Sequence, residues 1–229
     1  MITVALGRRA DVTALSGVGA LFVGAVLILT LGLIPLTNDI SVTSQTISQY
    51  GLSKGAWLFD LAVLLVAAGS ALCFTALRIQ NRLPVISATF GALWTIGLLV
   101  IVTFPRTNWA VETGSHLGGT LHRIASVVAF VCLPVAVLTG ARAAFPRPVR
   151  RAFIVRLLGA VSLGWFAVII GAIVVAAVNG ERWWEIIPLG LVERGMALTE
   201  IVALVILAAP LRRAREQFAT TTARVIDSR

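Results

Sequence analysis

Six apolar runs, each about as long as a membrane is thick, dominate this 229-residue chain. A helix needs roughly 20 residues to cross about 30 Å of hydrocarbon, and helices satisfy their own backbone polar groups where water is absent. The runs lie at Leu15–Leu36, Ala56–Leu77, Val85–Phe104, Gly118–Ala141, Phe153–Val178 and Gly190–Leu211. They predict an all-α fold: a polytopic membrane bundle of six transmembrane helices, forming one domain over residues 15–211.

The composition agrees with this class, because 58% of the residues are hydrophobic and only 13% are charged, against about 25% charged in soluble domains. Arg8 and Arg9 precede the first run as in a signal peptide. That run is longer than a signal-peptide core, and no small-residue cleavage site follows it. We therefore expect a multi-pass protein of the cell membrane (plasma membrane) that keeps its first helix.

The Lys and Arg residues predict the orientation, because cytoplasmic loops are enriched in them. If residues 1–14 are cytoplasmic, that side also receives the short arginine-rich connections and a basic tail at residues 212–229. The other side keeps Lys54, Arg106, Arg123, Arg182 and Arg194. The sequence thus predicts that both termini are cytoplasmic.

The same asymmetry explains the net charge of +9, since arginine-rich loops would face anionic lipid. No compact basic fold suggests nucleic acid, so we expect membrane lipid, or a membrane-protein partner, and no nucleic acid. Cys73 and Cys132 fall inside apolar runs, and His116 and His122 are six residues apart with no carboxylate at metal-ligand spacing. We expect no metal site and no cofactor.

Three runs carry an ionisable residue about one turn past their start, namely Asp60, His122 and Glu193. All three runs enter from the outer side in the predicted topology, so these groups form one layer roughly 5 to 6 Å below the helix starts. The helix dipole stabilises acids at this position without any function. It disfavours His122, Arg123 and Arg194, which therefore point more strongly to a site.

Glu200 lies seven residues after Glu193, on nearly the same helix face and about 10 Å deeper. A carboxyl group at this depth needs a partner, a proton or a wet cavity. We predict a polar cup in the outer leaflet, lined by Glu193 and Glu200 from the last helix and by His122 and Arg123 from the fourth.

Four segments together resemble the domain-of-unknown-function 998 family of bacterial and archaeal multi-pass membrane proteins: TISQYGLSKGAWLFD, TFPR, GGTLHRIASVVAFVCLPVAVL and GLVERGMALTEIVALVILAAPLRR. The resemblance covers about residues 15 to 213 and implies six membrane helices with no settled biochemical role. The positions that match the family pattern are Ser48, Tyr50, Pro105, His122, Glu193 and Arg194. The acidic residue expected after the Phe-Pro pair is missing, because Arg106 and Thr107 stand there; a carboxylate role at that turn is absent or passes to Glu112.

Two function classes follow. In the first, the protein binds a lipid or amphiphile head group or a membrane partner, with Arg123 and Arg194 as anion contacts and the loop of Ser48 and Tyr50 as a lid. In the second, it is an enzyme acting on a lipid-linked substrate at the extracytoplasmic face. His122 would then be the general base, Glu193 or Asp60 would orient it, and Ser48 or Tyr50 would be the nucleophile or a substrate contact.

The sequence favours binding over catalysis, because it contains no H-E-x-x-H and no glycine-rich phosphate loop. A transporter is a third alternative. It would need a polar pathway through both leaflets, and we find no charge deeper than Glu200 and no convincing inverted repeat.

Overall fold

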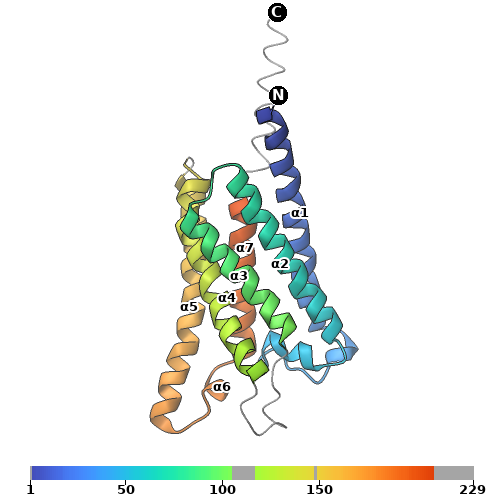
Figure 1. Ribbon diagram of the computed structural model, residues 1–229. Coiled ribbons are helices and arrows are strands. Elements are labelled where there is room, and N and C mark those ends of the chain that lie inside the picture. Colours follow the sequence, from blue (N-terminus) through green and yellow to red (C-terminus); the bar gives the residue numbers. More distant parts are fainter. Residues whose placement is uncertain (1, 105–116, 147–148, 209–229) are drawn as a thin grey trace, which may run out of the picture.

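The computed structural model describes residues 2–104, 117–146 and 149–208, and it contains helices but no strand in these ranges. Figure 1 shows the long helices running side by side, with α7 behind α3 and α4. The long helices are α1 (Ile2–Leu31), α2 (Ala56–Ile79), α3 (Val85–Thr103), α4 (Leu117–Ala144), α5 (Val149–Asn179) and α7 (Leu189–Ala208). The short ones are η1 (Pro35–Thr37), η2 (Ile47–Leu52) and α6 (Trp183–Ile186).

Five helices in the described residues are long and apolar enough to cross a membrane: Gly7–Leu31 of α1, and all of α2, α3, α4 and α5. The all-helical fold and the membrane class are thus confirmed. The sixth predicted span corresponds to α7, which has 20 residues but carries Glu193, Arg194 and Glu200. The count of six and the cytoplasmic termini stay predictions, and the predicted tail at 212–229 lies outside the described residues.

The first helix differs from its predicted span at both ends. It begins at Ile2, inside the expected cytoplasmic segment, and it ends at Leu31, five residues early. Pro35 causes the early end, because the residue before a proline avoids helical geometry and Ile34 is extended, with φ −91° and ψ 148°. The chain then turns into η1 and the connection that leads to α2.

α1 and α2 pack backbone against backbone through glycines. A Cβ on Gly69 would lie 2.7 Å from the carbonyl oxygen of Gly17, and a Cβ on Gly24 would lie 2.8 Å from that of Ala62. Small residues allow membrane helices to approach this closely and gain van der Waals contact. Gly24 and Gly69 both lie in this contact.

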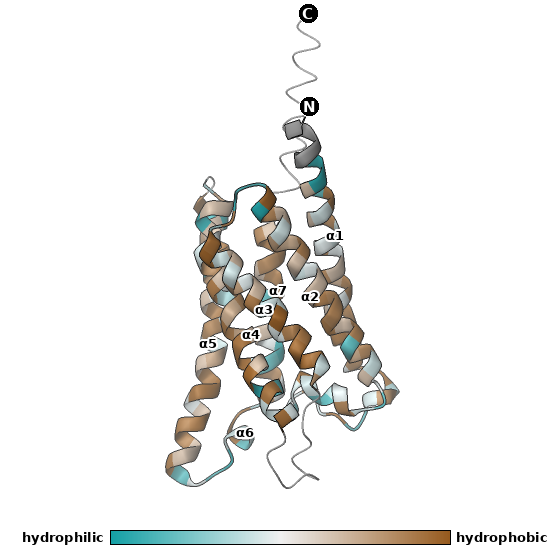
Figure 2. Ribbon diagram, viewed as in Figure 1, coloured by the Kyte–Doolittle hydropathy of each residue, from teal (hydrophilic) through white to brown (hydrophobic). Residues whose placement is uncertain are grey.

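Two buried serines join α2, α3 and α4 by hydrogen bonds. Trp94 Nε1 donates to Ser70 Oγ at 2.9 Å, and Ser87 Oγ donates to the carbonyl oxygen of Ala136 at 2.6 Å. Because no water reaches these positions, each polar atom is satisfied inside the bundle. Figure 2 shows that the residues of the long helices are mainly hydrophobic, with hydrophilic residues more frequent at the ends and in the connections.

The two ends of the bundle differ in structure. The α1–α2 connection and α6 lie at one end, which we call the loop end, together with the N-terminal turns of α4 and α7 (Figure 1). The α2–α3 and α4–α5 connections lie at the opposite end. His122 and Glu193, which were predicted to form a site and lie near the starts of α4 and α7, are therefore close to the loop end.

Candidate functional site

The connection between α1 and α2, residues 32–55, is held in a defined shape by hydroxyl groups. Thr37 Oγ1 donates to the carbonyl oxygens of Leu31 and Ile34, and Ser53 Oγ donates to the carbonyl oxygen of Tyr50 at 2.7 Å. The Tyr50 side chain is fully buried. The connection therefore packs against the bundle and covers part of the loop end.

Arg194 holds this connection to the first turns of α7. Its Nη1 donates to the carbonyl oxygens of Val42, Gln45 and Gly190, each at 2.9 Å, and its Nη2 donates to the Tyr50 hydroxyl at 2.9 Å. The guanidinium carbon is 5.4 Å from the centre of the Tyr50 ring, within cation–π range. We call these contacts the Arg194 clamp.

Further contacts join the same connection to α7. A carboxylate oxygen of Glu193 accepts a hydrogen bond from the Ile47 backbone N–H, and the Leu191 N–H donates to the Thr43 carbonyl oxygen at 3.2 Å. Gly190 lies so close that a Cβ would be 2.5 Å from two carbonyl oxygens of the connection. The start of α7 and the α1–α2 connection therefore form one packed unit.

Glu200 is buried two turns further along α7, with 1% of its surface exposed. Ser162 of α5 donates its hydroxyl to Glu200 Oε1 at 2.8 Å. Glu200 Oε2 is buried and has no hydrogen-bond partner among the described residues. A buried polar atom without a partner is rare and needs an explanation, such as a ligand or water.

His122 lies inside the bundle near the start of α4, with 4% exposure. Its Nδ1 is 2.9 Å from the carbonyl oxygen of Phe104, at the end of α3. Because a carbonyl oxygen only accepts, Nδ1 carries the proton, and in the neutral ring Nε2 is the acceptor. His122 therefore presents a defined tautomer.

The remaining predicted residues are Arg123, Ser48 and Asp60. Arg123 is exposed, and its Nη2 donates to Thr120 Oγ1 at 3.2 Å. The Ser48 hydroxyl is 3.1 Å from the Thr46 hydroxyl. Asp60 is half-buried near the start of α2 and has no hydrogen bond or ion pair within the described part of the chain. The described contacts thus bring together Tyr50, Glu193 and Arg194 but not Asp60.

Several predicted positions cannot be placed. Pro105, Arg106, Glu112 and His116 lie outside the described residues. Within ranges 2–104, 117–146 and 149–208, no group of three or more His, Cys, Asp or Glu residues could hold a metal ion.

Sequence reasoning missed two parts of this region. The first is Ser162, because a serine in a membrane helix usually bonds a carbonyl of its own helix and nothing in its neighbourhood signals Glu200. The second is the set of carbonyl acceptors at Val42 and Gln45, which have no signature in residue type. The one available signal for these acceptors was Arg194 itself, because a cation at the helix end that the dipole disfavours needs partners.

These features define the class: an α-helical integral membrane protein whose α1–α2 connection is fastened to α7. The chain belongs to the family described as "Protein of unknown function (DUF998)", whose model matches residues 18–210. The match includes nearly all the described helices and confirms the resemblance seen in the sequence. No curated protein and no solved structure matches the chain.

Proposed function

We propose that this protein of the cell membrane binds the head group of a membrane lipid or another amphiphile at the loop end of its bundle. The site would lie between α4, α5 and α7 and would include His122, Glu193 and Glu200. The observation that carries the proposal is the buried Oε2 atom of Glu200, which lacks a partner among the described residues.

We also propose that α7 is a sixth transmembrane helix. Twenty residues at about 1.5 Å each span roughly 30 Å, and α7 contacts α1, α2, α4 and α5. Its charged residues are held by the protein, since the clamp binds Arg194, Ile47 binds Glu193 and Ser162 binds Glu200. A helix surrounded in this way tolerates polar side chains that lipid would not.

The chemistry of the site favours a ligand that donates hydrogen bonds. Glu200 Oε2 in the carboxylate form and His122 Nε2 in the neutral ring are both acceptors, whereas Nη1 and Nη2 of Arg194 already donate to carbonyl oxygens and to the Tyr50 hydroxyl. A hydroxyl or primary ammonium group would supply the missing donor to Glu200. We therefore expect preference for head groups such as ethanolamine or a sugar over choline, which has no N–H.

The test is lipid binding to delipidated protein in detergent, followed by native mass spectrometry with phosphatidylethanolamine and phosphatidylcholine. We expect Glu200→Gln to weaken phosphatidylethanolamine binding about tenfold, because one acceptor becomes a donor and a charge-assisted hydrogen bond is lost. The control is Glu185→Gln, which changes a carboxylate that is 61% exposed.

Equal binding of both lipids, or unchanged binding to the Glu200→Gln protein, would contradict the proposal. A chemically altered lipid that disappears in His122→Ala would instead establish the enzyme hypothesis. These outcomes separate binding from catalysis in one set of spectra.

A further inference from the structure

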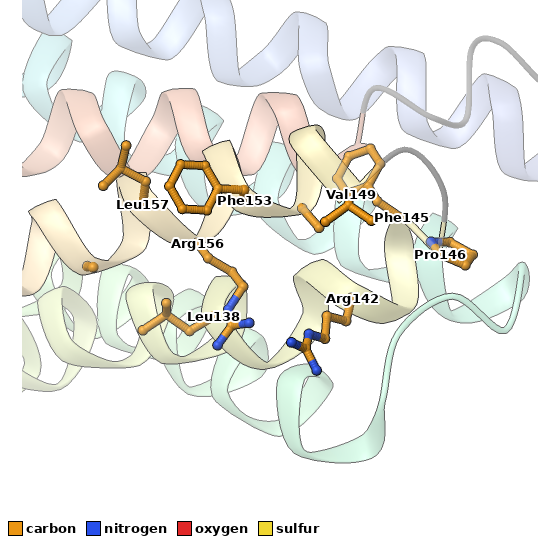
Figure 3. Close-up of a pocket in the computed structure, with 10 residues that line it drawn as sticks. Leu138, Arg142, Phe145, Pro146, Val149, Phe153, Arg156 and Leu157 are labelled. Carbon is orange, nitrogen blue, oxygen red and sulfur yellow. The ribbon is translucent and has the colours of Figure 1, made fainter.

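A groove of about 670 Å³ lies between α4 and α5, at the end of the bundle opposite the loop end (Figure 3). This volume falls in the range of small-molecule sites, roughly 300 to 1,000 Å³. Its walls are mainly apolar and include Leu138, Phe153 and Leu157, while its charged members are Arg142 and Arg156. The groove thus combines a hydrophobic surface with two cations.

The two arginines converge without an acidic partner. Figure 3 shows that Arg142 from α4 and Arg156 from α5 extend to the same side of the groove, with their guanidinium groups turned toward each other. Neither makes a hydrogen bond or ion pair within the described residues. The sequence contains no Asp or Glu between Glu112 and Glu181, so α4 and α5 have no acid to offer.

Two like charges that face each other repel, and an anion between them removes the repulsion. Guanidinium groups bind phosphate oxygens through paired N–H donors. The apolar walls would contribute nothing to a small hydrophilic anion. Phe153 is 63% exposed and Leu157 is 50% exposed, so these walls are open to the hydrocarbon in which the helices lie.

We infer that this groove binds an anionic phospholipid, with the phosphate between Arg142 and Arg156 and an acyl chain along Leu138, Phe153 and Leu157. Basic pockets between membrane helices are known to hold anionic head groups in this way. In the predicted orientation this end faces the cytoplasm, so the lipid belongs to the inner leaflet. The site is separate from the head-group site at the loop end and does not depend on it.

The experiment is a titration of the delipidated full-length protein with phosphatidylglycerol and phosphatidylcholine, read by native mass spectrometry. We expect the wild type to prefer phosphatidylglycerol and the double variant R142Q/R156Q to bind it about tenfold more weakly or worse, since charge-assisted hydrogen bonds are lost. The matched control is R150Q/R151Q. It removes two charges from the same end of α5 but leaves the groove lining intact.

A second variant tests the apolar part. Ala160 lines the groove and is exposed, so A160W fills the acyl-chain path and keeps both arginines; we expect it to weaken phosphatidylglycerol binding as well. Equal losses in R142Q/R156Q and R150Q/R151Q would overturn the inference, because they would indicate general surface charge. Unchanged binding in A160W, or displacement of the lipid by millimolar inorganic phosphate, would also overturn it.

Discussion

At the scale of single residues, Arg194 shows how a cation is kept near a membrane boundary with no acidic partner in the described part of the chain. The carbonyl oxygens of Val42 and Gln45 belong to irregular backbone and need donors, and the guanidinium supplies them at 2.9 Å. The arginine and the connection therefore satisfy each other. Removing the side chain would leave both carbonyls and the Tyr50 hydroxyl without this donor.

We predict that Arg194→Ala lowers the free energy of unfolding by about 3 kcal/mol, because hydrogen bonds to a charged group contribute about 1.5 to 3 kcal/mol and several are lost together. Tyr50→Phe removes one acceptor and should cost about 1 kcal/mol. The measurement is the apparent melting temperature in detergent. Arg182→Ala, whose side chain is 70% exposed, is the control and should change little. Equal melting temperatures for Arg194→Ala and wild type would show that the clamp does not stabilise the fold.

The sequence could identify the chemically costly residues but not their partners. His122 and Glu200 were expected inside the bundle because polar groups at these depths face protein, and both are buried. Arg194 was expected to contact an anion, and that contact stays a prediction; its contacts with carbonyl oxygens and the Tyr50 hydroxyl were not expected. Two of these carbonyl oxygens belong to a connection about 150 residues earlier in the chain, and only the tertiary fold brings them to Arg194.

At the scale of elements, the close packing of α1 against α2 depends on glycines, which have no side chain. A Cβ on Gly69 would lie 2.7 Å from the Gly17 carbonyl oxygen and 2.8 Å from the Leu21 backbone nitrogen. Backbone atoms in two packed helices cannot move aside as a flexible side chain can. Gly19 faces open space, since a Cβ added there would have nothing within 4 Å, so the two glycines offer a matched comparison.

We predict opposite effects of alanine at these two positions. Alanine is favoured over glycine in a helix by about 1 kcal/mol, so Gly19→Ala should leave the melting temperature unchanged or raise it. In Gly69→Ala, overpacking by about 1 to 3 kcal/mol opposes that gain and separates the helices, so the melting temperature should fall. Melting curves of the two variants in the same detergent provide the measurement. A Gly69→Ala protein as stable as Gly19→Ala would exclude a tight glycine contact.

The helices themselves were predictable because apolar length alone defines a membrane span. Their ends were less so: α1 stops at Leu31 since Pro35 forces an extended residue before it, whereas hydropathy continues to Leu36. The sequence could not predict η2 or the contacts that hold residues 42–47 against α7, because neither follows a periodic residue pattern. Connections are set by individual tertiary hydrogen bonds, which sequence periodicity does not encode.

At the scale of the whole molecule, the two ends of the bundle have different chemistry. The loop end contains the clamp, whose cation is bound by carbonyl oxygens. The opposite end contains Arg142 and Arg156, which have no acidic neighbours in α4 or α5. Exposed arginines favour the cytoplasmic side of a membrane. Arg194, whose guanidinium is hydrogen-bonded within the protein, adds little to that preference. The charge distribution thus predicts that the loop end lies outside.

This orientation is testable with single cysteines and a membrane-impermeant maleimide applied to intact cells. Ser44 in the α1–α2 connection and Arg150 at the opposite end are both exposed, while native Cys73 and Cys132 are buried and should give little background. We predict that Ser44→Cys is labelled and Arg150→Cys is labelled only after the cells are opened, because about 30 Å of hydrocarbon, roughly six helical turns, separates the two aqueous sides. A cysteine appended after Arg229 tests α7: protection in intact cells supports a sixth crossing, and labelling there would place the end of α7 outside and contradict it. If Arg150→Cys were labelled in intact cells and Ser44→Cys were not, the predicted orientation would be wrong. The anionic lipid groove would then face the outer leaflet.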